Sequence, residues 1–126
     1  MNAKSVLAGG ILLLIYTFFH AYTGYPMING LLDEASAGED LTRTVRVIWV
    51  FSSFTMALCG LWALFLYREL ASQGEKSNRQ LIVLGLAITI FGLYGFAQGF
   101  PNWHLLSFVL PGLLILIPGM FSHNED

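Results

Sequence analysis

Two histidines are the residues of this sequence whose types and positions are best suited to chemistry. His20 lies about one and a half helical turns before Pro26, and His104 follows a second proline at Pro101. An imidazole can carry a proton, ligate a metal, or donate and accept hydrogen bonds. Within an apolar segment such a ring is costly unless it finds partners. We therefore expect His20 at the centre of a site.

Six further residues have an estimated depth close to that of His20 on neighbouring apolar segments. With His20 they form the predicted ligand-binding set: Arg46, Trp49, Ser53, Tyr94, Gln98 and His104. We expect His20 to face inward and to lie near at least two of them. The alternative is a structural histidine whose ring is hydrogen-bonded to Tyr16, Tyr94 or a backbone carbonyl.

Several kinds of chemistry stay open for these residues. Histidines on two different helices could hold a haem between them. A zinc or copper ion would need a third ligand, which Asp33 or Glu34 could supply. An acid–base enzyme would use His20 with Arg46 or His104. The sequence has no hydrolase elbow, phosphate loop or HExxH motif, and its single cysteine, Cys59, excludes a CxxC pair. We therefore predict no metal site and assign no cofactor or catalytic residue.

The composition identifies the solvent in which these residues must be positioned. Hydrophobic residues make up 56% of the 126 and charged residues 11%, whereas soluble domains carry about 25% charged residues. Three long runs contain no charge, between Lys4 and Asp33, Arg46 and Arg68, and Arg79 and Glu125. One span needs about 20 residues. The third run is long enough for two, and Pro101 divides it.

These runs predict an all-α membrane protein, a four-transmembrane-helix bundle forming one domain over residues 1–126. The expected spans are about 5–25, 45–67, 80–100 and 103–121. Pro26 to Glu34 is expected to form a short amphipathic segment between the first two spans, lying in the headgroup plane. It would close the bundle or act as a lid over a pocket. Asp40 is expected to be the N-cap of the second long helix.

Small and polar residues at helical spacing predict the inward faces of the four spans, because lipid offers such residues no partners. The four predicted stripes are Gly9, Leu13, Tyr16, His20 and Thr23; Arg46, Val50, Ser53, Ala57 and Gly60; Gly85, Gly92, Gly95 and Gly99; and His104, Ser107, Pro111, Leu114 and Pro118. We expect Gly92, Gly95 and Gly99 to meet a helix of the same bundle closely. Dimerisation through Gly95 and Gly99 is the alternative.

The basic residues predict the orientation. Lys4, Arg68, Lys76 and Arg79 fall on one side of the predicted spans, and Arg43 and Arg46 on the other. The positive-inside rule therefore places both termini in the cytoplasm, in a bacterial-type inner membrane or its equivalent. A net charge of −2 without a basic tract makes nucleic acid an unexpected partner.

Three functions remain open at this point. The first is binding of an amphipathic or lipid-like small molecule in a polar pocket in the non-cytoplasmic half of the bundle. The second is an enzyme or a haem or metal protein built on His20. The third is an accessory subunit of a larger membrane complex, or a homo-oligomer. Arg43 and Arg46 either pair with the nearby acidic residues or recognise a lipid phosphate or a carboxylate.

Overall fold

The computed structural model describes residues 3–73, 78–99 and 102–121, without the side chains of residues 73, 102 and 103. Every element in this part is helical. In chain order they are α1 (Ala3–Phe19), the π-helical turn η1 (His20–Gly24), α2 (Tyr25–Glu34), α3 (Glu39–Gln73), α4 (Asn78–Ala97), the 3-10 segment η2 (Asn102–Phe108) and α5 (Val109–Phe121). They include four helical stretches long and apolar enough to cross a membrane. The predicted number of such helices is confirmed.

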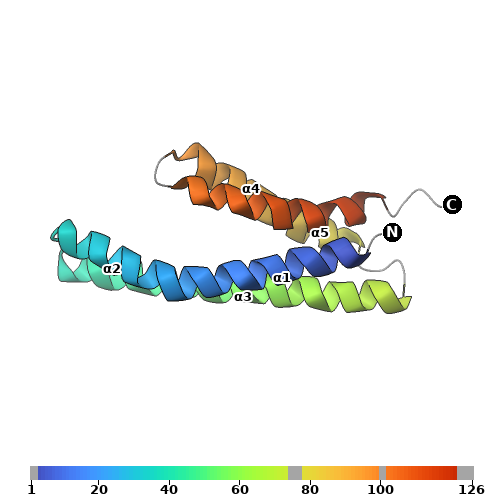
Figure 1. The fold of residues 1–126 in the computed structure, drawn as a ribbon, viewed down its shortest axis with the longest axis horizontal. Coiled ribbons are helices and arrows are strands. Elements are labelled where there is room, and N and C mark those ends of the chain that lie inside the picture. The colour runs from blue at the N-terminus through green and yellow to red at the C-terminus, as the bar shows by residue number, and fades with distance from the viewer. Residues whose placement is uncertain (1–2, 74–77, 100–101, 122–126) are drawn as a thin grey trace.

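The helices form two antiparallel hairpins (Figure 1). One consists of α1, η1 and α2 against α3, and the other of α4 against η2 and α5. The two hairpins meet mainly through α1 and α5, while α3 and α4 make few contacts with each other. The hairpins are close together where the chain ends lie, which we call the closed end, and they diverge toward the opposite, open end (Figure 1).

The segment predicted to lie in the headgroup plane is instead a continuation of the first helix. Residues Ala3–Glu34 form one 32-residue helical stretch that includes η1 and α2. Pro26 gives the reason for the π-helical turn, because its ring lacks an N–H and would clash with the carbonyl of Tyr22 in a regular helix. A wider turn with i+5 hydrogen bonds accommodates the proline without ending the helix. The prediction of a separate amphipathic segment is therefore wrong.

A tight turn joins α2 to α3. Ser36 has a φ of 50°, its N–H donates to the carbonyl of Asp33 at 3.0 Å, and the N–H of Ala37 donates to that of Leu32 at 3.0 Å. This pair of bonds is the Schellman arrangement that ends many helices. Helix α3 begins at Glu39, so Asp40 lies in its first turn and not at its N-cap. Its charge still lies near the positive end of the helix dipole.

The first hairpin extends beyond the second at the open end (Figure 1). Helix α3 has 35 residues and α4 has 20. At 1.5 Å per residue these lengths are about 52 Å and about 30 Å. We call the projecting part, residues 25–46, the arm. It consists of α2, the turn and the start of α3.

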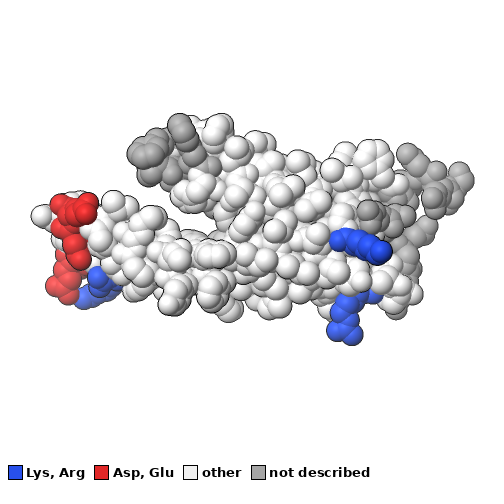
Figure 2. Space-filling model, viewed as in Figure 1, with Lys and Arg blue, Asp and Glu red and all other residues white. Residues whose placement is uncertain are grey.

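Charged side chains gather at the two ends of the molecule (Figure 2). The arm carries four acidic residues and two arginines: Asp33, Glu34, Glu39, Asp40, Arg43 and Arg46. Lys4, Arg68 and Arg79 lie toward the closed end. The helices between these groups present an apolar surface, as expected of a multi-pass membrane protein.

Glycines bring α4 close to the second half of its hairpin. A Cβ added at Gly92 would lie 3.0 Å from the backbone nitrogen of Val109, and one at Gly95 would lie 2.8 Å from the Cβ of Leu105. The predicted close approach within one bundle is confirmed for these two glycines. It is wrong for Gly99, which has a φ of 78° and, among the residues that the structure describes, no atom within 4 Å of its Cβ position. Gly99 serves the turn after α4, where the left-handed conformation favours glycine.

The predicted inward face of the first helix is largely correct. Gly9 and Leu13 are buried, and Tyr16 and His20 are half-buried. Thr23 is exposed, and its hydroxyl donates to the carbonyl of Phe19 in its own helix. Gly24 is buried in its place. The π-helical turn explains this shift, because one extra residue per turn rotates the following positions around the axis.

The inward faces of α3 and α5 differ more from the prediction. On α3, Arg46 and Val50 are exposed, and a seven-residue repeat faces the rest of the molecule: Trp49, Met56, Ala63 and Leu70. This repeat is typical of long helices packed side by side. In the second hairpin, His104 and Ser107 are exposed and Phe108 is buried. Pro111 and Pro118 are buried as predicted.

Candidate functional site

His20 lies at the junction of α1 and η1, with its half-buried ring against α3. The imidazole meets the Trp49 indole edge to face, with ring centroids 4.2 Å apart and planes at 87°. Its Nε2 lies 3.2 Å from the Oγ of Ser52. The predicted contact between His20 and Trp49 is therefore confirmed. The serine that the ring contacts is Ser52 and not the predicted Ser53.

Trp49 holds the backbone of η1 as well as the His20 ring. Its Nε1 donates a hydrogen bond to the carbonyl oxygen of His20 at 3.1 Å. The indole also covers Gly24, since a Cβ added there would lie 2.5 Å from Cζ2 of Trp49. Helix pairing changes from i+4 to i+5 in this turn, and the second lone pair of the His20 carbonyl oxygen accepts the bond from the indole. Gly24 makes the close approach possible because it has no side chain.

The hydrogen bonds around Ser52 indicate which nitrogen of His20 carries the proton. A serine hydroxyl has one proton to donate, and the Oγ of Ser52 lies 2.8 Å from the carbonyl oxygen of Trp49 in donating geometry. With its proton committed there, Oγ accepts from the N–H at Nε2 of His20. We infer the neutral tautomer protonated at Nε2, which leaves Nδ1 as an acceptor. Ser53 donates to the same Trp49 carbonyl at 3.0 Å.

His104 belongs to the other hairpin. It lies in η2 and is exposed. The two histidines thus come from segments 84 positions apart in the sequence. The two hairpins that carry them diverge toward the open end (Figure 1).

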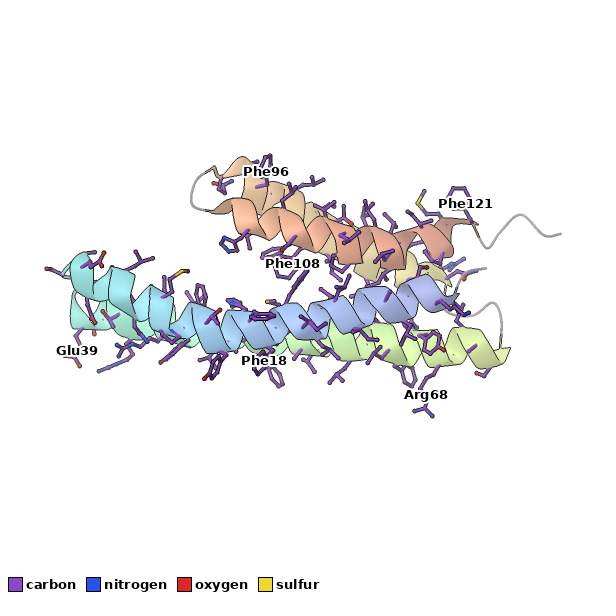
Figure 3. The ribbon with its side chains drawn as sticks, viewed as in Figure 1. Phe18, Glu39, Arg68, Phe96, Phe108 and Phe121 are labelled. Carbon is purple, nitrogen blue, oxygen red and sulfur yellow. The ribbon has the colours of Figure 1, made fainter. Side chains whose placement is uncertain are left out.

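An aromatic cluster lies one helical turn closer to the closed end. Tyr16 packs edge-on against Phe108, with centroids 5.7 Å apart, and Phe108 packs edge-on against Phe91 at 5.5 Å. Figure 3 shows Phe108 between the hairpins, reaching toward α1. The space-filling view shows a notch between the two hairpins at the open end (Figure 2). We call this hollow the notch, and in the aromatic cluster Tyr16 and Phe108 pack on each other across the two hairpins.

Three of the predicted site residues do not reach His20. Tyr94 is 65% exposed and Gln98 is exposed just beyond α4, because the glycine face of α4 turns toward α5 and leaves Tyr94 outside. Arg46 extends toward the arm, where its Nε donates to Oδ1 of Asn29 at 2.7 Å. Residue type suggested all three, but the rotation of each helix about its own axis decides which side chains meet.

The possibility that Asp33 or Glu34 completes a metal site with the histidines is wrong. Asp33 follows His20 by 13 residues of one continuous helical stretch, which separates the two by about 20 Å along the axis. Within the described ranges, no cluster of three or more His, Cys, Asp or Glu side chains is arranged to hold a metal ion.

The function of this protein is inferred from the geometry of its described residues. No protein-family model, curated protein or solved structure matches this chain.

Proposed function

We propose that this protein crosses a bilayer four times and binds an amphipathic small molecule or lipid in the notch. The polar group of the ligand would bind His20, and its apolar chain would lie on the accessible parts of Tyr16 and Phe91. The observation that carries the proposal is the His20 ring held by Ser52 and Trp49. The tautomer inferred from the hydrogen bonds of Ser52 leaves Nδ1 of this ring as an acceptor.

The lengths and charges of the helices support a placement in the membrane. A hydrocarbon core about 30 Å thick corresponds to about 20 helical residues. Counted from Lys4, these reach Gly24, so His20 would lie about 6 Å inside the core boundary. The excess of Lys and Arg at the closed end favours that end as cytoplasmic, with both termini there. The notch would then open toward the non-cytoplasmic surface, and the arm would project from it.

The orientation of His20 specifies the chemistry of the ligand. An acceptor at Nδ1 binds a hydroxyl or another N–H or O–H donor. Such a bond is stronger away from water than in it, because the surroundings have a low dielectric constant. The partly accessible rings of Tyr16 and Phe91 offer apolar surface for a chain or ring. A lipid with a free hydroxyl and a quinol both combine these features.

Two substitutions at His20 test this proposal. Native mass spectrometry of the protein in mild detergent would measure binding of phosphatidylglycerol and of a short-chain quinol. His20→Ala should abolish binding while the helices remain folded by circular dichroism. Tyr94→Ala, an exposed position outside the notch, is the matched control and should bind as the unsubstituted protein does.

His20→Gln separates a binding role from a structural one. The amide of glutamine can replace the hydrogen bond to Ser52 but not the acid–base chemistry of an imidazole. Full stability with lost binding would support a ligand site. If His20→Ala binds both probes as tightly as the unsubstituted protein, His20 is a packing residue and the proposal fails.

The position of one histidine on each hairpin leaves a second candidate function, in which both imidazoles would hold a haem or another cofactor. An absorption spectrum and metal analysis of protein purified from membranes test this. A Soret band that disappears in both His20→Ala and His104→Ala would support it, and a colourless, metal-free sample with bound lipid would support the first proposal. A co-purifying protein would instead indicate a subunit of a larger complex.

A further inference from the structure

Arg46 lies at the base of the arm and is held by a neutral partner. Its Nε donates to Oδ1 of Asn29 at 2.7 Å. The next arginine toward the tip behaves differently, since Arg43 forms an ion pair with Glu39 at 2.9 Å. Among the described residues, no carboxylate lies within 4 Å of the Arg46 guanidinium. The positive charge of Arg46 is therefore not compensated by an ion pair with a described residue, although four acidic residues share the arm with it.

The bond to Asn29 uses the Nε–H group of the Arg46 guanidinium. The two terminal nitrogens, Nη1 and Nη2, form a planar fork that matches the oxygens of a phosphate or a carboxylate in bidentate fashion. Because Asn29 is an amide, it fixes the side chain without neutralising it. The fork is thus oriented and charged, which favours binding of an anion over a purely structural role.

Arg46 lies on the same side of α3 as Trp49, since both side chains bond to the helical stretch Ala3–Glu34. The two are three residues apart, which places them on one helical face, with Arg46 about 4.5 Å closer to the tip. Asn29 follows His20 by nine residues, so the Arg46 head group would lie about 13 Å from the His20 ring along the hairpin axis. This separation exceeds the size of a small hydroxy acid, and a larger amphiphile is needed to bridge the two residues.

We propose that Arg46, oriented by Asn29, binds the anionic phosphate or carboxylate of an amphiphile whose polar backbone reaches His20. This inference rests on the proposed function and narrows it, because it selects anionic lipids over zwitterionic ones. Asp33, Glu34 and Asp40 lie toward the tip of the arm, with Asp33 one turn beyond Asn29. They oppose anion binding at low salt, and their effect is screened over about 8 Å at physiological ionic strength.

The experiment compares two arginines on the same helix. Native mass spectrometry would measure binding of phosphatidylglycerol and of phosphatidylcholine with identical acyl chains, and inorganic phosphate would be added as a competitor. Arg46→Gln should lower the preference for phosphatidylglycerol by about tenfold, which corresponds to one charge-assisted contact of about 1.4 kcal/mol. Arg43→Gln, with its partner Glu39 on the surface, should leave the preference unchanged.

Asn29→Asp is a second test of the Arg46 site, in which Arg46 itself is kept. A carboxylate of the same size at this position would neutralise the guanidinium, so the preference for phosphatidylglycerol should fall as it does in Arg46→Gln. Equal losses in Arg43→Gln and Arg46→Gln would indicate general surface charge and overturn the proposal. An unchanged preference in both Arg46→Gln and Asn29→Asp would also overturn it.

The remaining outcomes of this experiment distinguish the source of the anion and separate the Arg46 proposal from the proposed function of the notch. Displacement of phosphatidylglycerol by millimolar inorganic phosphate would identify free phosphate as the anion bound, and resistance to it would identify the lipid head group. If His20→Ala loses both lipids while Arg46→Gln keeps its preference, the notch function stands and the Arg46 site falls. If Arg46→Gln loses its preference while His20→Ala binds normally, the anion site stands without the notch.

Discussion

The indole nitrogen of Trp49 donates a hydrogen bond to the backbone carbonyl of His20 at 3.1 Å, across the interface between α1 and α3. The same indole meets the His20 ring at 4.2 Å and covers Gly24. The bond forms in the one described turn with π-helical pairing. The direction of His20 is therefore set by α3 as well as by its own helix.

Trp49→Phe should destabilise the protein by about 1 kcal/mol, because it removes this hydrogen bond and keeps most of the aromatic packing. Unfolding in a denaturing detergent would measure the change, and amide exchange at residues 20–25 should become faster. Trp62→Phe is the control, since the Trp62 indole donates to the exposed side chain of Gln80 at 3.3 Å. This variant should lose less stability than Trp49→Phe. Equal losses at the two tryptophans would contradict a special role for Trp49.

Gly24→Ala should displace the Trp49 indole, because the added Cβ would lie 2.5 Å from it. Overpacking of this kind costs about 1–3 kcal/mol. Gly30→Ala, on the same hairpin with no atom within 4 Å of its Cβ position, should instead stabilise α2 by about 0.5–1 kcal/mol. Tryptophan fluorescence and thermal unfolding would report both variants. A stable Gly24→Ala with an unchanged spectrum would show that the indole does not rest on Gly24.

Gly95→Leu should separate α4 from η2, because even one added carbon would lie 2.8 Å from the Cβ of Leu105. We expect a loss of stability of about 1–3 kcal/mol from overpacking. Ala97→Leu adds a larger side chain at an exposed position of the same helix, and should be nearly neutral. Thermal unfolding in one detergent compares the two. If the two variants unfold at the same temperature, Gly95 does not lie in a close contact.

Ser36→Gly should stabilise the tip of the arm by about 1 kcal/mol. Ser36 has a φ of 50°, and this left-handed conformation costs a residue with a Cβ about 1–2 kcal/mol. Ala35→Gly is the control, since Ala35 has an ordinary helical φ of −75° and glycine there should destabilise by about 0.5–1 kcal/mol. Amide exchange at residues 35–38 would show slower opening in the first variant and faster opening in the second.

Labelling of introduced cysteines tests the proposed topology, after Cys59 has been replaced by alanine. A thiol at Gly38, in the turn of the arm, should react with an impermeant reagent added to intact cells. A thiol at Ser72, which is exposed near the closed end, should react only after the membrane is opened. The opposite pattern would invert the orientation, and equal reaction at both sites in intact cells would refute the four-span topology.

Part of the candidate site could be predicted from residue types and spacing. The polar ring of His20 in an uncharged run had to find partners, and its stripe with Gly9, Leu13 and Tyr16 is nearly that of the structure. Ser52 was missed because Ser53 follows it and fitted a face of α3 that began at Arg46. The seven-residue spacing of Trp49, Met56, Ala63 and Leu70 was the signal that would have found it.

The sequence by itself determined the helical class, the four apolar stretches and the position of the charges at their ends, because the solvation of charges and backbone is a local property of each segment. Only the tertiary structure decided that α2 continues α1, that Tyr94 faces outward and that Ser52 meets the His20 ring. A helical pattern leaves the rotation of each helix and the angle between hairpins open. Those are set by side chains that meet across the interface, such as Trp49 on Gly24 and Leu105 on Gly95.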